Sequence, residues 1–373
     1  MQKETRIKLA LAGASVVMTL IILEGMVQVF LSAPQTVRVR SKGFNPTQSA
    51  PDQVVENHPG QSSIYVHTPT GGRLRPNTHV TIENHRLSGK RVEIETNSLG
   101  YRNREIGEKR GRRILFLGDS ITFSDYLPDA ETFVRQVEKM ARESGQNWET
   151  VNAGVGAIGL ENELAILMET GISIDPDVVV VCWYLNDFHA SPGVRIQRLP
   201  WPFDLSRLAT HVWWLYNRAI ASADRRLGAK GGRDALADSL SARGGTPEQV
   251  AFDNVILSAY PDWGGAWAKE TWPVQATAFE RMRDLASTHG FQLSVVAFPV
   301  RGQVEASFVE DLPQRRLKVL MADLDLPLLD LLPVLRGAYT RSIPLFLDHC
   351  HHTAEGSELI ATTIHDFLVA RAP

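Results

Sequence analysis

The sequence predicts an α/β fold in which a parallel β-sheet lies between two layers of helices. Short apolar runs typical of buried strands alternate with longer segments whose apolar residues recur at helical spacing. This alternation favours a parallel sheet, because consecutive parallel strands are joined by helical crossovers. In addition, glycines and polar residues directly follow several apolar runs, at the edge of the sheet where such folds place their chemistry.

The first strand of the predicted sheet is the apolar run 114–117, which is too short for a helix. Gly118 ends this run, and a helical pattern follows from Asp129, the expected N-cap, to Gly145. The other elements follow from the same two periodicities. Strands are expected at 113–117, 150–153, 177–185, 291–298 and 327–331. Helices are expected at 130–144, 160–170, 275–289, 313–323 and 355–370.

The amino terminus predicts a membrane anchor. Residues 9–31 form an almost wholly apolar run of about 23 residues, enough to cross a bilayer. A cleaved signal peptide is the alternative, but Pro34 after Ala33 spoils the best cleavage site and the run is long for a signal. We therefore expect a single-pass helix, with residues 1–8 in the cytoplasm and the large domain on the extracytoplasmic side.

The segment between the anchor and the sheet divides into a linker and a lead-in. The linker is polar and rich in Pro, Ser and Gln. The lead-in predicts a β-hairpin, in which Val80 and Ile82 lie opposite Val92 and Ile94. The expected boundaries are 32–63 for the linker, 64–110 for the lead-in and 111–373 for the α/β domain, with an insertion at 190–275.

The insertion lacks the alternation of strand and helix, and its glycine-rich tract at 228–245 predicts a mobile loop. It also contains six of the eight tryptophans. These rings form either a local aromatic core or a cap over the active site, where they would stack on sugars or line an acyl pocket. The six are Trp201, Trp213, Trp214, Trp263, Trp267 and Trp272.

Composition excludes some classes of function. The net charge is −3, from 39 basic and 42 acidic residues, so the chain lacks the basic excess of a nucleic-acid-binding protein. The only two cysteines, Cys182 and Cys350, fit no metal-ligand pattern and no disulfide framework. We expect two free thiols, although export would permit a disulfide.

Three polar motifs stand at the ends of predicted elements. Residues 118–120 (Gly-Asp-Ser) end the first strand, 186–187 (Asn-Asp) close the third, and 348–351 (Asp-His-Cys-His) precede the last helix. Over about residues 95–370, this combination resembles the SGNH (GDSL-type) hydrolase family. The resemblance implies a three-layer α/β/α sandwich of the flavodoxin-like kind and a serine ester hydrolase without metal or cofactor. Residues 97–102 also resemble a lead-in found before the catalytic domain in membrane-anchored members.

Ser120 is the candidate nucleophile, and its hydroxyl becomes reactive only when a base removes its proton. The resemblance implies that His351 is this base and that Asp348 orients it through the other ring nitrogen. His349 and His352 compete for the role, and the Asp-x-x-His spacing selects His351. A surface histidine cluster that caps the last helix, or a metal site, is the alternative for this group.

The resemblance also implies an oxyanion hole. Its donors would be the backbone N–H of Ser120, the side-chain amide of Asn186 and a backbone N–H in the glycine loop after the second strand. The family has a glycine at the position of Ala157. Alanine supplies the same N–H if the turn allows a negative φ, so either Ala157 or Gly156 is the expected donor. Asp187 is expected to fix its loop rather than to react.

The glycine loop also matches the dinucleotide fingerprint Gly-x-Gly-x-x-Gly at 154–159. Glu161 and Glu163 would repel a pyrophosphate from the first turn of the next helix. The acid that the fingerprint requires at the end of the next strand is missing there, since Asp175 and Asp177 lie at its beginning. We therefore reject a dinucleotide site.

These residues predict a serine ester hydrolase or O-acyl transferase that forms an acyl-enzyme on Ser120. Ser124, Asp125 and Tyr126 follow where a lipase would keep an apolar wall, which favours short acyl esters such as O-acetyl groups on an extracytoplasmic glycan. A lipase, lysophospholipase or thioesterase of the same fold is the first alternative. A non-catalytic, membrane-anchored scaffold in surface-polysaccharide assembly is an alternative of another class.

Overall fold

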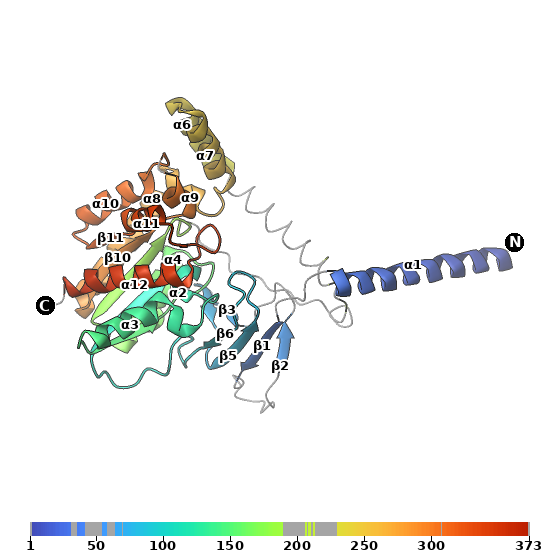
Figure 1. Cartoon of the computed structure of the whole chain (residues 1–373), viewed down its shortest axis with the longest axis horizontal. Helices are drawn as coiled ribbons and strands as arrows, with labels where there is room; N and C mark the ends of the chain where they lie inside the picture. Colours follow the sequence, from blue (N-terminus) through green and yellow to red (C-terminus); the bar gives the residue numbers. More distant parts are fainter. Residues whose placement is uncertain are drawn as a thin grey trace.

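The computed structural model describes residues 2–30, 36–41, 54–57, 64–68, 70–188, 206, 208–209, 212, 230–306 and 308–371. Its centre is a five-stranded sheet in the order β11-β10-β9-β7-β8 (Figure 1). Every neighbouring pair in this sheet is parallel, as predicted. The strands are β7 (Arg112–Gly118), β8 (Trp148–Asn152), β9 (Val178–Tyr184), β10 (Gln292–Phe298) and β11 (Leu328–Asp330). Each lies within two residues of its expected position.

The strand order is the flavodoxin-like one, because β7, the first strand of this sheet, lies between the second and the third. The chain therefore leaves β7 toward β8 on one side and later returns to β9 on the other, which makes the carboxyl end of β7 the topological switch point. All seven residues of β9 and six of the seven in β7 are buried. Their apolar, β-branched runs are what a strand covered on both faces requires.

The five helices that the sequence predicts in the α/β domain are all present. Helix α12 packs against α3, and α4 packs against α8. In Figure 1, α3 and α12 cross the front of the sheet. The five expected helices are α3 (Phe133–Glu143), α4 (Leu160–Ile166), α8 (Trp272–His289), α10 (Leu312–Asp323) and α12 (Ala354–Val369). The short helices α9 (Arg301–Glu305) and α11 (Leu332–Thr340) were not expected.

The N-cap of α3 differs from the prediction. Thr132 caps this helix, since its hydroxyl accepts a hydrogen bond from Arg135 N, whereas Asp129 opens a separate short turn, η1 (Asp129–Glu131). Thr132 lies three residues after Asp129 in the chain and also has a side-chain oxygen that can cap a helix. The sequence alone did not show which of these two residues is the N-cap.

The lead-in contains the predicted hairpin in the predicted register. Val80 lies opposite Ile94, and Ile82 lies opposite Val92. These two strands, β5 (Thr78–Glu83) and β6 (Val92–Glu95), belong to a four-stranded sheet with β1 (Thr36–Ser41) and β2 (Val54–Asn57). A second hairpin pairs β3 (Tyr65–Thr68) with β4 (Gly71–Leu74). The segment expected to be linker thus includes two strands, because Val37 and Val39 alternate with polar residues in a strand pattern.

The amino-terminal segment forms helix α1 (Gln2–Phe30), which covers most of the stretch expected to anchor the chain. Among the residues that the structure describes, no helix has the length and apolar character that a bilayer span needs. The transmembrane helix predicted at 9–31 is therefore not supported.

Part of the insertion is helical, and the expectation of a mobile loop at 228–245 is wrong for its described part. Helix α6 (Lys230–Arg243) begins within the glycine-rich tract, and α7 (Pro247–Ser258) follows it. Leu236 and Leu240 lie four residues apart and are both buried, so they give α6 an apolar stripe despite its glycines.

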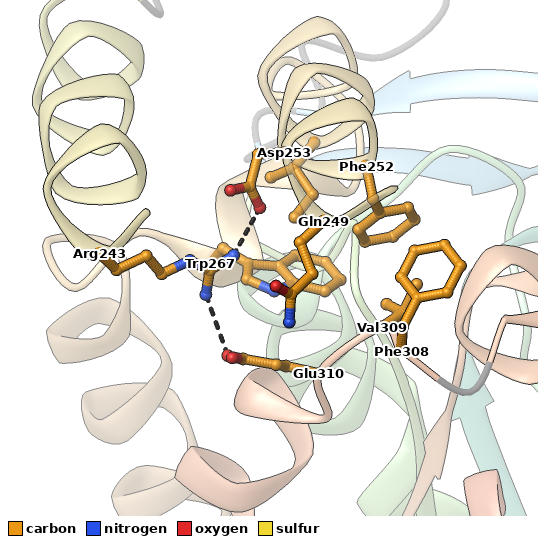
Figure 2. A pocket seen from close by; sticks show the side chains of 9 residues that line it. Arg243, Gln249, Phe252, Asp253, Trp267, Phe308, Val309 and Glu310 are labelled. Atoms are coloured by element: carbon orange, nitrogen blue, oxygen red, sulfur yellow. Dashed lines mark hydrogen bonds and ion pairs between the residues drawn. The ribbon is translucent and has the colours of Figure 1, made fainter. Parts of the chain in front are cut away.

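The described tryptophans of the insertion form a local core rather than an open cap. Trp263 and Trp267 are buried and pack edge to face, with ring centroids 5.7 Å apart. Phe252 completes this cluster. Figure 2 shows the small pocket beside Trp267, where Arg243 bridges Asp253 and Glu310. Trp272 is half-buried against Trp183, and Trp201, Trp213 and Trp214 lie outside the described residues.

Candidate active site

The nucleophile motif lies at the carboxyl end of β7, at the switch point of the sheet. Gly118 ends the strand, and Asp119 caps the one-turn helix α2 (Ser120–Phe123) by accepting a hydrogen bond from Ile121 N at 2.9 Å. Gly118 is required here, because a Cβ at this position would meet the Thr122 hydroxyl at 2.1 Å. The strand-to-helix turn thus leaves Ser120 partly exposed above a buried core.

The structure brings Ser120, His351 and Asp348 together in one hydrogen-bonded chain. Ser120 Oγ lies 3.0 Å from His351 Nε2, and His351 Nδ1 lies 2.7 Å from Asp348 Oδ2. With the proton on Nδ1 donated to the carboxylate, Nε2 has a lone pair for the serine hydroxyl, a tautomer assigned from this network. The predicted roles of all three residues fit this geometry, although Ser120 and His351 are 231 residues apart in sequence.

Asp348 is held in place by its own loop. Its Oδ1 accepts backbone N–H groups of Cys350 at 2.9 Å and His351 at 2.8 Å. Burial alone would raise the pKa of Asp348, but the hydrogen bonds and the charge interaction with His351, together with these N–H groups, lower it below its usual value. The carboxylate is therefore ionised at neutral pH and stabilises a protonated His351.

The two competing histidines are engaged elsewhere. His352 is buried between the rings of Phe298 and Phe346, and its burial lowers its pKa to about 3. His349 points to Asp262 at 3.6 Å, and this carboxylate raises the pKa of His349. Neither ring replaces His351 beside the serine, so the Asp-x-x-His spacing selects the histidine that contacts Ser120.

The glycine loop after β8 lies directly beside the nucleophile. Val155 N donates to Gly118 O at 3.1 Å, and the Asn152 side chain donates to Thr122 O at 2.8 Å. Gly154 is required for this approach, since a Cβ there would meet Phe123 N at 2.3 Å. The loop and the nucleophile helix are thus joined through their backbones.

Ala157 does not have the negative φ that was the condition for its role as donor, because its φ is 58°. This left-handed conformation is the one that glycine adopts freely, which gives a physical reason for the family's glycine at this position. Alanine tolerates it at a cost of about 1 kcal/mol. Ala157 is exposed, whereas the Tyr65 phenol lies against Gly156, where a Cβ would meet the phenol oxygen at 2.3 Å. These contacts favour Ala157 N–H as the donor from this loop.

Asn186 and Asp187 follow β9, the strand on the other side of β7. Asn186 is half-buried, and its side chain contributes a hydrogen bond that lowers the pKa of Asp119 against the larger, raising effect of burial. Asp187 fixes its loop as predicted: its Oδ2 accepts Tyr184 N at 2.9 Å, and its carbonyl accepts Gln275 Nε2 at 2.8 Å. The three candidate oxyanion donors therefore follow three adjacent strands.

The active site also includes lead-in residues that sequence reasoning missed. Tyr65, from β3, packs on Phe123 beside the nucleophile, with ring centroids 6.1 Å apart. His85 is buried in the turn between β5 and β6, and its pKa is lowered by burial despite the nearby Asp125. Neither residue carries a motif, and the only available signal was the proximity of the lead-in to the catalytic domain in sequence.

A metal is not needed to explain the histidine loop. Asp348, Cys350 and His351 bring their ligand atoms within 4.8 Å of one another. Both ring nitrogens of His351 already have partners in the triad, and the Cys350 sulfur lies 3.6 Å from Nδ1, farther than the carboxylate. Cys350 and Cys182 are both buried free thiols, as predicted.

Comparisons with known proteins found matches among solved structures. No family model and no curated protein matches the chain. An acetyl xylan esterase, AlAXEase, is 13% identical with a TM-score of 0.40, over 68% of this chain and 98% of that one. TesA is 14% identical with a TM-score of 0.41, over 70% and 99%. A member of the lipolytic protein G-D-S-L family from Veillonella parvula is 14% identical with a TM-score of 0.38, over 68% and 96%.

At such identities and TM-scores, these likenesses carry no argument about the chemistry of this chain. That argument rests on the parallel sheet and on the geometry of Ser120, His351 and Asp348. The motifs, the sheet order and this triad are similar to those that the resemblance to the SGNH (GDSL-type) hydrolases implied.

Proposed function

We propose that the chain is a serine hydrolase that cleaves short acyl esters, with O-acetyl groups of a glycan as its substrate class. The observation that carries the proposal is the hydrogen-bonded chain from Ser120 Oγ through His351 to Asp348, at 3.0 and 2.7 Å. A serine so placed, beside backbone and amide donors from adjacent loops, has both the base and the oxyanion stabilisation that acyl transfer requires.

The reaction follows from the position of each group. Ser120 Oγ attacks the acyl carbon while His351 Nε2 takes its proton, and the new oxyanion receives hydrogen bonds from Ser120 N, Ala157 N and Asn186. His351 then gives the proton to the leaving alcohol, and the acyl group stays on Ser120. A water molecule, activated by His351, attacks the acyl-enzyme and releases the acid. In a transferase, a second alcohol would take the place of this water.

The polar surroundings of the triad support a short acyl group. Ser124 turns its hydroxyl inward to Ile121 O, and Tyr126 packs edge-on against the His351 ring with centroids 4.8 Å apart. The half-exposed pair His349 and Asp262 lies near His351, with 6.4 Å between the ring centroids of the two histidines. This pair offers hydrogen bonds to hydroxyl groups, whereas a long acyl chain would require apolar walls. The buried Trp263 and Trp267 lend no support to sugar stacking.

A chain-length series of p-nitrophenyl esters tests the substrate class. We expect the highest kcat/KM for acetate and a decline with longer acyl chains. Preference for eight carbons or more would move the protein to the lipase and lysophospholipase alternative. Activity on an acetylated oligosaccharide, with release of acetate, would then test the glycan directly. The extracytoplasmic location stays a prediction.

Labelling by a fluorophosphonate probe separates the enzyme from the scaffold alternative. We expect stoichiometric labelling of the native chain and none of Ser120→Ala. A folded wild-type chain that takes up no label would favour the non-catalytic scaffold, because a silent triad has no activated serine.

A further inference from the structure

Helix α2, which carries the nucleophile, is too short to provide hydrogen-bond partners for its own backbone carbonyls. A helix leaves its last four carbonyls without internal partners, so a single turn depends almost wholly on donors from outside. Ser124 ends the turn in the left-handed conformation, and its backbone N–H and hydroxyl donate to Ser120 O and Ile121 O. The Asn152 side chain donates a hydrogen bond to Thr122 O. The next carbonyls, from Phe123 onward, need a further donor.

Arg102 of the lead-in supplies that donor. Its guanidinium donates to Phe123 O at 2.9 Å, Ser124 O at 2.5 Å and Leu127 O at 2.8 Å. The side chain is 2% exposed, so these bonds are made away from water. The Nε atom has no hydrogen-bond partner among the described residues, and Asp129 lies 4.0 Å from it. One planar fork thus holds both ends of a buried loop.

The loop that Arg102 holds reaches the base as well as the nucleophile. It begins at the end of α2 and includes Tyr126, which is 1% exposed and lies against the His351 ring. A shift of this loop would therefore move both Ser120 and the Tyr126 ring that packs against His351. Small displacements of reacting groups are known to lower rates strongly.

The motif around Arg102 is built to deliver this side chain. Asn97 Oδ1 accepts Leu99 N at 3.0 Å and Tyr101 N at 2.9 Å, which closes a tight turn. Gly100 has a φ of 77°, and a Cβ there would meet Leu74 O at 2.4 Å. The Tyr101 hydroxyl lies 2.5 Å from that of Thr170, so the turn is fixed on the α/β domain. Asn97, Gly100 and Tyr101 thus hold the turn that places the Arg102 side chain.

We propose that Arg102 is a positioning residue of the active site, which sets the geometry of Ser120 and His351 through the loop 123–127 and touches no substrate. The proposal deepens the proposed ester hydrolysis and rests on it. It assigns a role to the lead-in motif and makes the lead-in part of the catalytic unit.

The test compares Arg102→Ala with Arg113→Ala in the full chain. Arg113 is a matched control: its side chain is 5% exposed and donates to the carbonyls of Ile174 and Gly107, but at the opposite end of β7. Each variant is first checked for folding by circular dichroism and thermal unfolding. Then kcat and KM are measured on p-nitrophenyl acetate, with and without added guanidinium at concentrations far below those that unfold proteins.

We expect kcat of Arg102→Ala to fall by about 10- to 100-fold with KM nearly unchanged, because the lost bonds act on the machinery and not on the substrate. Guanidinium should restore part of this loss, whereas Arg113→Ala should keep kcat within about twofold and show no rescue. A folded Arg102→Ala with wild-type kcat, or an equal loss in Arg113→Ala, overturns the proposal. So does a loss that guanidinium leaves unchanged.

Two further measurements keep the test decisive. If Arg102→Ala does not fold, Arg102→Lys replaces it, since lysine keeps the charge but not the fork; full kcat in that variant overturns the proposal. If the wild type hydrolyses no ester of the series, the proposed function fails by itself. Arg102 is then judged by the rate of fluorophosphonate labelling at Ser120, and equal rates in wild type and Arg102→Ala overturn its role.

Discussion

Replacing Asp348 with asparagine should disable His351 while the fold is kept. The Asp348 side chain accepts two backbone N–H groups on Oδ1 and the His351 ring on Oδ2. In asparagine only the oxygen accepts, so it should stay with the backbone donors and turn its NH₂ toward His351 Nδ1. That ring nitrogen must then accept, which moves the ring proton to Nε2. A protonated Nε2 cannot take the proton of Ser120.

The size of the effect follows from the loss of the active tautomer. The corresponding change in a serine protease triad lowers kcat by about 10⁴-fold, or about 5.4 kcal/mol in activation free energy. The 2.7 and 3.0 Å distances in this chain place its three groups within the same hydrogen-bond reach. We therefore expect a loss of about 10³- to 10⁴-fold in kcat on p-nitrophenyl acetate, with KM nearly unchanged.

The chain provides a matched control in a second histidine–aspartate pair. His365 Nδ1 lies 3.3 Å from Asp366 Oδ1 on helix α12, in a pair that belongs to none of the catalytic loops. Asp366→Asn makes the same chemical change and the same change of net charge, and should leave kcat as it is. A folded Asp348→Asn variant that loses less than about tenfold would refute the tautomer argument.

The thermal stability of Asp348→Asn can also be measured, and the direction of its pH dependence follows from the pKa of Asp348. The pKa of Asp348 is lower in the folded chain than its unfolded value of about 3.9, so its stabilising contribution is present above that pH. It is lost as the pH falls through the folded pKa. Asp348→Asn should therefore lower Tm more at neutral pH than at about pH 3. An equal difference at both pH values would contradict the charge interaction.

Three further predictions concern neighbouring groups. Burial raises the pKa of Glu163, so stability should fall as the pH rises above about 4.3, and Glu163→Gln should remove up to about 1.4 kcal/mol per pH unit of that fall in urea unfolding; an unchanged slope would refute this. Ala157→Gly should keep kcat and Ala157→Val should lower it, because Ala157 has a φ of 58°, which a β-branched residue adopts poorly. Equal kcat values in the two variants would contradict the left-handed conformation at this position. Cys182 and Cys350 should titrate as two thiols only after unfolding, without reductant.

The central sheet and the triad were predictable because each depends on a local pattern. A strand covered on both faces must be apolar throughout, and β9 is buried at all seven positions. The hairpin register follows from alternation, since Val80 and Ile82 can face the core only in one pairing. The choice of His351 came from the family resemblance, whose Asp-x-x-His spacing lets one loop present both groups.

Other features depend on contacts that local patterns do not contain. The left-handed φ of Ala157 is imposed by the turn between β8 and α4, against the preference of alanine. Helix α6 overrides its glycines through the burial of Leu236 and Leu240. The contact of Tyr65 with Gly156 joins residues that are 91 positions apart (156 − 65). In each case tertiary packing decides over intrinsic preference.

The division at residue 110 between lead-in and α/β domain illustrates why boundaries drawn from sequence miss this kind of contact. Periodicity changes there from strand to α/β alternation, but several bonds that cross this boundary run from side chains to backbone carbonyls and carboxylates. Arg102 bonds to the loop after α2, Arg73 pairs with Glu169 at 2.8 Å, and Lys90 pairs with Glu131. Carbonyl acceptors leave no trace in the sequence, because every residue has one. When a nucleophile lies on a one-turn helix, the carbonyls of that helix must receive hydrogen bonds from buried donors elsewhere in the chain.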